Sequence, residues 1–224
     1  MIGSAITLDD LFRDGYKAIF VGTGVWKPRA LHIKGETLGN VHFGINYLNN
    51  PEVFRLGERV IIIGAGNAAM DVARTALRNG SHDITCFSIT KKVAASDYEF
   101  SYAQLEGIKF EYNYKPVEIV DDGVIFRKVE ETEDGKLLEV PDSDVKFESD
   151  SVIISISQGP ETRLLDEDQT IHTNSRGTVD VDETGHTSRP GVFASGDITS
   201  GAKTVVEAVA HSKVVAESMH RYMQ

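Results

Sequence analysis

The sequence has little cysteine, little positive charge and few long apolar stretches. Its only cysteine, Cys86, excludes an internal disulfide, a CxxC redox pair and a four-cysteine metal or iron–sulfur site within the chain. The net charge of -11 argues against a protein that neutralises nucleic-acid phosphates or docks on anionic lipid. Any redox chemistry must therefore use a bound cofactor, and the expected partners are small molecules or proteins.

Signals for membrane insertion and export are also missing. No apolar stretch reaches the roughly 18 residues that a membrane helix needs. The segment 1–10 has neither the basic start nor the apolar run of a signal peptide. With 224 residues, 41% of them hydrophobic and 25% charged, the composition is that of a globular chain of one large or two small domains. We therefore expect a soluble, cytoplasmic protein.

The first half of the chain predicts strands that alternate with helices. The β-branched run at 59–63 is typical of a strand buried in a parallel sheet. A helix at 67–78, a strand at 83–89, a helix at 98–105 and a strand at 107–112 follow it. This alternation predicts an α/β fold with a doubly wound sheet.

The flanking segments predict shorter elements. Before the first β-branched run we expect a helix, a strand, an irregular loop and a second helix, at 4–15, 17–21, 25–39 and 44–54. After the alternating region, Asp-Gly turns separate four short strands of an antiparallel meander, at 117–120, 123–130, 136–140 and 145–147. Three more strands and a closing amphipathic helix are expected at 151–156, 179–181, 191–194 and 204–222.

The strongest motif is Gly64-x-Gly66-x-x-Ala69, which directly follows one predicted strand and opens one predicted helix. The first glycine permits a tight turn, the second lets the backbone approach a pyrophosphate, and Ala69 still permits close packing. The pyrophosphate would lie on the start of the helix, at Asn67 and Ala68, where N–H groups and the helix dipole favour negative charge. Three small residues can also form a plain tight turn, but the surrounding strand–helix–strand pattern favours dinucleotide binding.

The choice of dinucleotide depends on the end of the next strand. About 20 residues beyond the glycines, an acidic side chain would hold the ribose 2′-hydroxyl of NAD. The sequence instead has Ser88, Thr90, Lys91 and Lys92 there. Two ammonium groups and two hydroxyls suit a 2′-phosphate, so NADP is favoured over NAD. An ordinary basic loop remains the alternative.

A second candidate site lies at the end of the predicted strand 191–194. This strand delivers Gly196 and Asp197, and the following helix can direct its positive N-terminus at a ligand. The Asp197 carboxylate can accept hydrogen bonds from a polyol. It can equally serve as a turn residue, and the residues alone do not decide between the two.

Almost the whole chain resembles the flavoprotein oxidoreductases that bind two dinucleotides, most closely the FAD/NAD(P)-dependent, glutamate synthase small-subunit-like branch. Four matching stretches carry this resemblance, at 64–71, 98–107, 156–160 and 191–210. The resemblance implies a Rossmann-like NAD(P)-binding domain, built from a parallel sheet and an antiparallel meander, that is inserted in a partial FAD-binding domain. The implied boundaries are 1–49 and 158–224 for the FAD part and 50–157 for the NAD(P) part.

The resemblance also assigns cofactor contacts. It implies that FAD is lined by Gly22, Thr23 and Gly24, by Gly196 and Asp197, and by Thr204 and Val205 beside the isoalloxazine ring. Gln158 and Gly159, in the third matching stretch, are further candidate contacts. The implied activity is hydride transfer from NAD(P)H to FAD and onward to a partner subunit or iron–sulfur centre. Because the cofactors carry this chemistry, we predict no catalytic acid or base and no metal site.

One departure from the family pattern affects the flavin. Such proteins begin with another strand, glycine-rich turn and helix that hold the FAD pyrophosphate, and this sequence does not contain them. We therefore expect the chain alone to bind FAD poorly, to be inactive by itself and to expose apolar surface where that layer would pack. A rival hypothesis is a non-catalytic dinucleotide-binding module that acts as a sensor or assembly subunit. A disulfide or thioredoxin reductase is disfavoured because a CxxC pair is missing.

Overall fold

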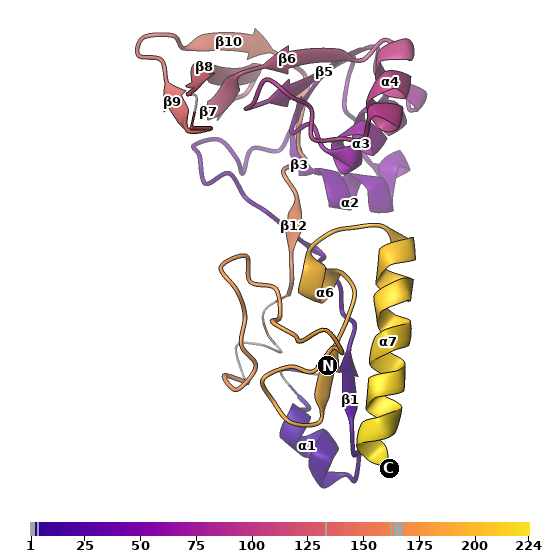
Figure 1. Ribbon diagram of the computed structural model, residues 1–224. Coiled ribbons are helices and arrows are strands. Elements are labelled where there is room, and N and C mark those ends of the chain that lie inside the picture. The colour runs from indigo at the N-terminus through magenta and orange to yellow at the C-terminus, as the bar shows by residue number, and fades with distance from the viewer. Residues whose placement is uncertain (1–2, 4, 133, 162, 164–167) are drawn as a thin grey trace. The chain divides into compact units, whose positions relative to one another are not determined.

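The computed structural model describes residues 3, 5–132, 134–161, 163 and 168–224 (Figure 1). The chain forms two compact units. Met1–Lys27 and Gln158–Gln224 make up the terminal unit, and Pro28–Ser157 makes up the inserted unit. We expected the first boundary after residue 49, but residues 28–49 belong to the inserted unit because a strand within them pairs with its sheet. Two short strands, β2 (Lys27–Pro28) and β12 (Gln158–Gly159), lie at the points where the chain passes between the units.

The inserted unit is built on a five-stranded parallel sheet. In spatial order its strands are β3 (Val41–Phe43), β11 (Ser151–Ile154), β4 (Arg59–Ile63), β5 (Asp83–Ser88) and β6 (Lys109–Tyr112). Every neighbouring pair is parallel, which confirms the predicted parallel sheet. From β4 the chain proceeds through β5 to β6 on one side, whereas β11 lies on the other side. The sheet therefore has its topological switch point between β4 and β11.

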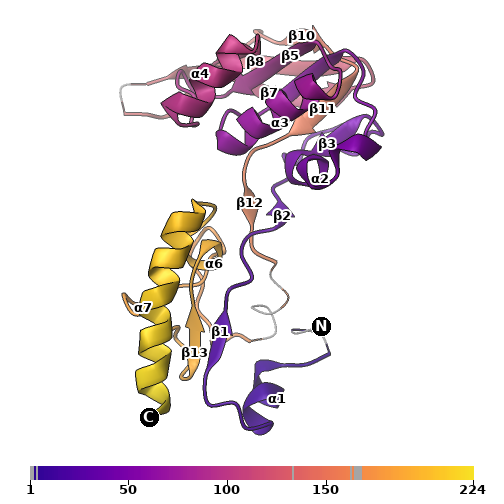
Figure 2. The same ribbon diagram turned by 90° about the vertical axis from the view of Figure 1, so that its right-hand side faces the viewer.

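Helices cover one face of this sheet (Figures 1 and 2). They are α2 (Gly44–Asn49), the short 3-10 helix η1 (Pro51–Val53), α3 (Asn67–Arg78) and α4 (Asp97–Leu105). Val60 and Ile62 of β4 point to this side and pack in one core with Met70 of α3. Ile61 and Ile63 alternate to the opposite face. The uninterrupted apolar run of β4 thus follows from burial on both sides.

The predicted antiparallel meander covers the opposite face. It consists of β7 (Tyr114–Val120), β8 (Gly123–Glu131), β9 (Leu137–Glu139) and β10 (Val145–Glu148), of which the other three all pair with β8. The Phe87 ring of β5 stacks on the ring of Phe126 in β8, with 4.0 Å between centroids and 9° between planes. Phe147 contacts both rings edge-on. This aromatic group joins the meander to the sheet.

The terminal unit contains a two-stranded parallel sheet, in which β1 (Ile19–Val21) pairs with β13 (Val192–Ala194). The helices that the structure describes in this unit are α1 (Leu8–Arg13), α6 (Asp197–Ser200) and α7 (Val205–Met223), and α7 runs along the strands (Figures 1 and 2). Thr7 caps α1, in a reciprocal capping box with Asp10. The strand predicted at 179–181 was wrong. Val179 forms only an isolated bridge, and its N–H donates to Ile198 of α6.

Candidate functional site

Gly64 lies where β4 ends, beside the switch point of the sheet. Its φ is +129°, and its N–H donates to the Phe87 carbonyl at 2.9 Å. A Cβ at this position would come within 2.2 Å of the Ser155 carbonyl oxygen, in the chain just after β11. Both the backbone angle and this close approach require glycine. The fold therefore requires glycine at position 64 whether or not a ligand binds.

Gly66 is different, although it belongs to the same motif. It is the N-cap residue of α3, with φ of −90° and ψ of 178°, which any residue adopts. A Cβ added there would meet no atom within 4 Å. Its carbonyl accepts the N–H groups of Ala69 and Met70, so the N–H groups of Asn67 and Ala68 have no acceptor within the helix. This glycine leaves open space directly above a helix N-terminus, which suits a phosphate group.

The four residues predicted to read the 2′-phosphate lie in and after the end of β5, next to the glycine turn. The hydroxyls of Ser88 and Thr90 both donate to the Lys92 carbonyl, at 3.2 and 2.8 Å, and thereby shape the loop. Lys91 and Lys92 are exposed, and in the part of the chain that the structure describes neither has an ion pair. Recognition of a 2′-phosphate would therefore depend on the two ammonium groups rather than on the hydroxyls.

In the terminal unit, the pairing of Val21 with Ala194 brings the ends of β1 and β13 together. The predicted flavin contacts Gly22, Thr23 and Gly24 follow β1, with Gly24 at φ +70°. Gly196 follows β13 with φ of 77° and ψ of −154°, a combination that is essentially restricted to glycine.

Asp197 opens α6 and keeps acceptor capacity for a ligand. One of its carboxylate oxygens accepts the Lys203 N–H at 3.3 Å, and within the described residues the other has no hydrogen bond. Thr204 caps α7, and its hydroxyl exchanges hydrogen bonds with Glu207. Its backbone N–H also donates to the Glu207 carboxylate, at 3.1 Å, so the hydroxyl and the amide of Thr204 are both used within the protein. Val205, next to it, has 78% of its surface exposed.

The remaining predicted contacts are Gln158 and Gly159 of β12. Both are half-buried, and a Cβ on Gly159 would meet no atom within 4 Å. Their predicted cofactor contacts, like those of the other candidate residues, stay predictions.

Apolar surface is exposed on the terminal unit, as the sequence led us to expect. Phe20 of β1 has 43% of its surface exposed, and Val206 and Val209 of α7 are also exposed. Among the described residues, β13 is the only strand that pairs with β1. Within the described residues the terminal unit thus has one unpaired edge of β1, and it exposes apolar side chains on β1 and α7.

A hydrogen-bonded group in the terminal unit was not predicted. The buried Ser195 hydroxyl lies 2.9 Å from Nδ1 of His211, and Ser212 donates to it at 3.0 Å. His211 lines a cavity of about 520 Å³ together with Gly196 and Lys203. Because Ser195 follows β13 and His211 lies 16 positions later on α7, no local sequence signal joins them.

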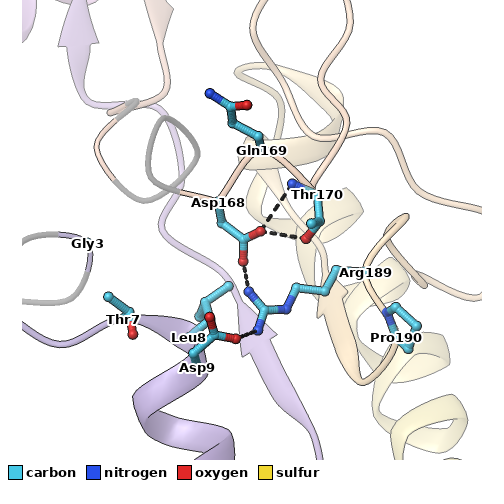
Figure 3. A pocket seen from close by; sticks show the side chains of 9 residues that line it. All are labelled: Gly3, Thr7, Leu8, Asp9, Asp168, Gln169, Thr170, Arg189 and Pro190. Carbon is cyan, nitrogen blue, oxygen red and sulfur yellow. Dashed lines mark hydrogen bonds and ion pairs between the residues drawn. The ribbon is translucent and has the colours of Figure 1, made fainter.

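Another cavity of the terminal unit, of about 440 Å³, is lined by a half-buried arginine. Figure 3 shows the Arg189 side chain directed at the carboxylates of Asp9 and Asp168, with which it forms ion pairs. Thr170 also donates its N–H to Asp168 at 3.1 Å. Since two carboxylates already neutralise the guanidinium, this cluster joins α1 to the segment before β13 and does not attract an anion.

The described residues give no support for a cysteine nucleophile, a metal site or a membrane-spanning helix. Burial raises the pKa of the Cys86 thiol, so that it is no nucleophile. Within the same residues, no group of three His, Cys, Asp or Glu side chains is arranged to hold a metal ion. The described helices also lack one with both the length and the apolar character needed to cross a bilayer.

Comparison with known proteins agrees with this architecture. The chain is 33% identical to the beta subunit of the NADP(+)-dependent formate dehydrogenase of Moorella thermoacetica, with 100% of the chain and 34% of that protein covered. It is 30% identical to the glutamate synthase [NADPH] small chain of Azospirillum brasilense, with 99% of the chain and 52% of that protein covered. The chain therefore spans about half or less of the length of these relatives.

Solved structures give the same fold. A thioredoxin reductase of T. acidophilum superimposes with a TM-score of 0.74 at 25% identity, covering 92% of this chain and 65% of that one. FprA of Mycobacterium tuberculosis superimposes with a TM-score of 0.78 at 15% identity, covering 100% and 67%. Residues 4–212 match the pyridine nucleotide-disulphide oxidoreductase family. The chain belongs to this family, and the predicted resemblance to the glutamate synthase small subunit is confirmed.

Proposed function

We propose that the chain is the pyridine-nucleotide-binding part of a flavin-dependent oxidoreductase that oxidises NADPH and passes the electrons to a partner protein. Membership of the family supports the reaction class. Several relatives are named as NADP-dependent or NADPH-dependent subunits, including an NADPH-Fe(3+) oxidoreductase subunit beta of Geobacter sulfurreducens. The acidic net charge of -11 favours a protein acceptor, such as a partner subunit or an iron–sulfur protein, over nucleic acid or an anionic membrane.

The contrast between Gly64 and Gly66 is the observation that carries this proposal. Gly64 is required by the fold, whereas Gly66 has an ordinary backbone conformation and no neighbour that a side chain would meet. The open space above Gly66 lies at the carboxyl end of β4, beside the switch point, where open α/β sheets bind ligands. A dinucleotide pyrophosphate on the start of α3 explains why this position is glycine.

The lysines after β5 support NADPH as the preferred nucleotide. Lys91 and Lys92 follow the strand next to the glycine turn, where the ribose of a dinucleotide bound to this motif would lie. An exposed ammonium without a carboxylate partner can pair with a 2′-phosphate at little cost in lost contacts. NADH lacks that phosphate and would gain nothing from these side chains.

The end of the terminal-unit sheet fits a flavin in part. Gly22, Gly24 and Gly196 have no side chains, so that a flavin could approach their backbone closely. Asp197 supplies an acceptor for ribityl hydroxyls. FAD bound there would accept the hydride and release electrons singly or in pairs. The chain's own contribution is to bind and orient, since no acid or base is assigned.

The test is a calorimetric titration of the purified chain with NADPH, NADH and FAD in parallel. We expect NADPH to bind more tightly than NADH and FAD to bind weakly. A double variant, Lys91→Ala with Lys92→Ala, should lower the NADPH affinity about tenfold or more and leave NADH unchanged, since charged hydrogen bonds contribute about 1.5–3 kcal/mol each. Lys128→Ala, an exposed lysine of β8 with no ion pair among the described residues, is the matched control.

The outcomes separate the parts of the proposal. Equal affinity for NADPH and NADH would contradict the role of the lysines, and no nucleotide binding at all would contradict the proposed function. Tight FAD binding by this chain would contradict the expectation of an incomplete flavin site. A non-catalytic module predicts the same NADPH titration, so the protein isolated from its native source should also be examined for bound flavin by its absorption spectrum.

A further inference from the structure

The loop that carries the two lysines is attached to the glycine turn. We call residues 89–96, which join β5 to α4, the lysine loop. The backbone N–H groups of Ala94 and Ala95 both donate to the Ala65 carbonyl, at 2.9 and 3.0 Å. These bonds join the loop to the residue between Gly64 and Gly66. Because they use backbone atoms only, they do not depend on the side chains present.

One side chain adds to this attachment. The Asn67 side-chain oxygen Oδ1 accepts the Ser96 N–H at 2.8 Å, across 29 positions of sequence. Asn67 is exposed and is the first residue of α3, so neither packing nor helix propensity accounts for an asparagine there. The sequence predicts a cofactor contact at Asn67 through the start of the helix, and this contact stays a prediction; the side-chain oxygen of Asn67 is used within the protein.

The other end of the lysine loop is held separately. Ser88 and Thr90 donate their hydroxyls to the Lys92 carbonyl, which closes the first part of the loop on itself. Lys91 and Lys92 therefore lie between two fixed points, the hydroxyl pair on one side and the Asn67 bond on the other. An ammonium on an ordered loop loses less conformational freedom when it binds a phosphate, so fixing the loop raises the affinity.

We propose that Asn67 is a positioning residue for nucleotide selectivity, which holds the lysine loop so that Lys91 and Lys92 can bind the 2′-phosphate of NADPH. This inference rests on the proposed function. It adds that the preference for NADPH over NADH depends on Asn67, which follows the glycine turn and acts through the lysine loop. Loss of the Asn67 bond should therefore weaken NADPH binding and leave NADH binding nearly unchanged.

Two variants remove the bond from opposite ends. Asn67→Ala removes the acceptor. Ser96→Pro removes the N–H donor, and the φ of −62° at Ser96 already suits proline. Ser96→Ala is the matched control, because it keeps the N–H group and loses only the Ser96 hydroxyl that caps α4 by accepting the Glu99 N–H.

The readout is the ratio of the NADH and NADPH dissociation constants, measured by calorimetry on the intact chain. Asn67→Ala and Ser96→Pro should each lower this ratio about three- to tenfold, as expected for loss of one hydrogen bond. The double variant should lower it no further than either single change, because both remove the same bond. Ser96→Ala should leave the ratio within about twofold of wild type. If Ser96→Pro fails to fold, Asn67→Ala compared with Ser96→Ala still decides.

Two results would overturn the inference while the proposed function stands. In the first, wild type prefers NADPH and the lysine variant abolishes the preference, but Asn67→Ala leaves the ratio unchanged. In the second, Asn67→Ala weakens NADH and NADPH by the same factor, which would mean that Asn67 contacts a part common to both nucleotides. A wild-type chain that binds neither nucleotide would overturn the inference together with the proposed function.

Discussion

Gly64→Ala should lower the stability of the fold, whereas Gly66→Ala should lower the affinity for NADPH, although the two glycines are only two positions apart. At Gly64 an alanine must adopt a φ of +129°, and left-handed backbone conformations cost an ordinary residue about 1–2 kcal/mol. Its Cβ would also lie 2.2 Å from the Ser155 oxygen, about 1.2 Å short of the 3.4 Å at which ordinary contact begins. Relieving that overlap means moving backbone, which typically costs about 1–3 kcal/mol.

Together these terms predict that Gly64→Ala lowers the free energy of unfolding by about 2–5 kcal/mol, a large share of the total stability of a typical domain. Gly66→Ala introduces no overlap and no backbone strain, so its stability should stay within about 1 kcal/mol of wild type. In the proposed site, however, a Cβ at Gly66 occupies the space of the pyrophosphate. NADPH binding should therefore fall at least tenfold with alanine and be lost with a bulky residue such as leucine.

Urea unfolding followed by circular dichroism measures the first effect, and calorimetric titration with NADPH measures the second. Equal stability of Gly64→Ala and wild type would refute the structural role assigned to Gly64. If Gly66→Leu kept full NADPH affinity, the nucleotide would have to bind elsewhere. A Gly66→Ala protein destabilised by more than about 2 kcal/mol would show that the position has a structural requirement after all.

Two further predictions concern the inserted unit. Phe126→Ala should lower the free energy of unfolding by about 3–5 kcal/mol in urea titrations, because the fully buried ring stacks on Phe87; a loss below about 1 kcal/mol would contradict this packing. Asp150 accepts hydrogen bonds from the Arg59 side chain and backbone, which hold the pKa of its carboxyl below the ordinary value of 3.8. A carboxyl whose pKa is lower in the folded state stabilises the fold at pH values above its unfolded-state pKa. This stabilisation is lost as the pH falls through the folded-state pKa. Asp150→Asn should thus be less stable than wild type by about 1 kcal/mol at pH 7, and the difference should begin to shrink as the pH falls below about 4; a difference that stays constant from pH 7 down to about pH 2 would contradict it.

The elements that the sequence predicted best are those whose apolar residues follow one regular pattern along the whole element. β4 and α3 begin and end at the predicted residues, because β4 is apolar on both faces and α3 has its apolar residues at helical spacing before Gly80. β3 was missed because three residues flanked by Asn40 and Gly44 show no period, and its pairing with β11 depends on a strand more than 100 positions away.

The candidate site was predictable where the motif is local and unpredictable where it depends on contacts across the fold. The glycine turn could be recognised from one strand and one helix. That Gly64 serves the fold depends on Ser155, which only the sheet order brings near. Likewise Ser88 and Thr90 have hydroxyls that suit a phosphate, but the turn of the backbone directs both to the Lys92 carbonyl. Residue type gave the chemistry, and the tertiary structure decided which atoms remain available.

The buried thiol of Cys86 has a consequence for how the inserted unit can be observed. It lies at the centre of β5, between β4 and β6, and none of its surface is exposed. Alkylating reagents and peroxide react with thiolates, so Cys86 can react only when the sheet opens. As the single cysteine of the chain, it is a natural chemical probe in the middle of the sheet. The rate at which it is modified reports how often that sheet opens, without any label having to be introduced.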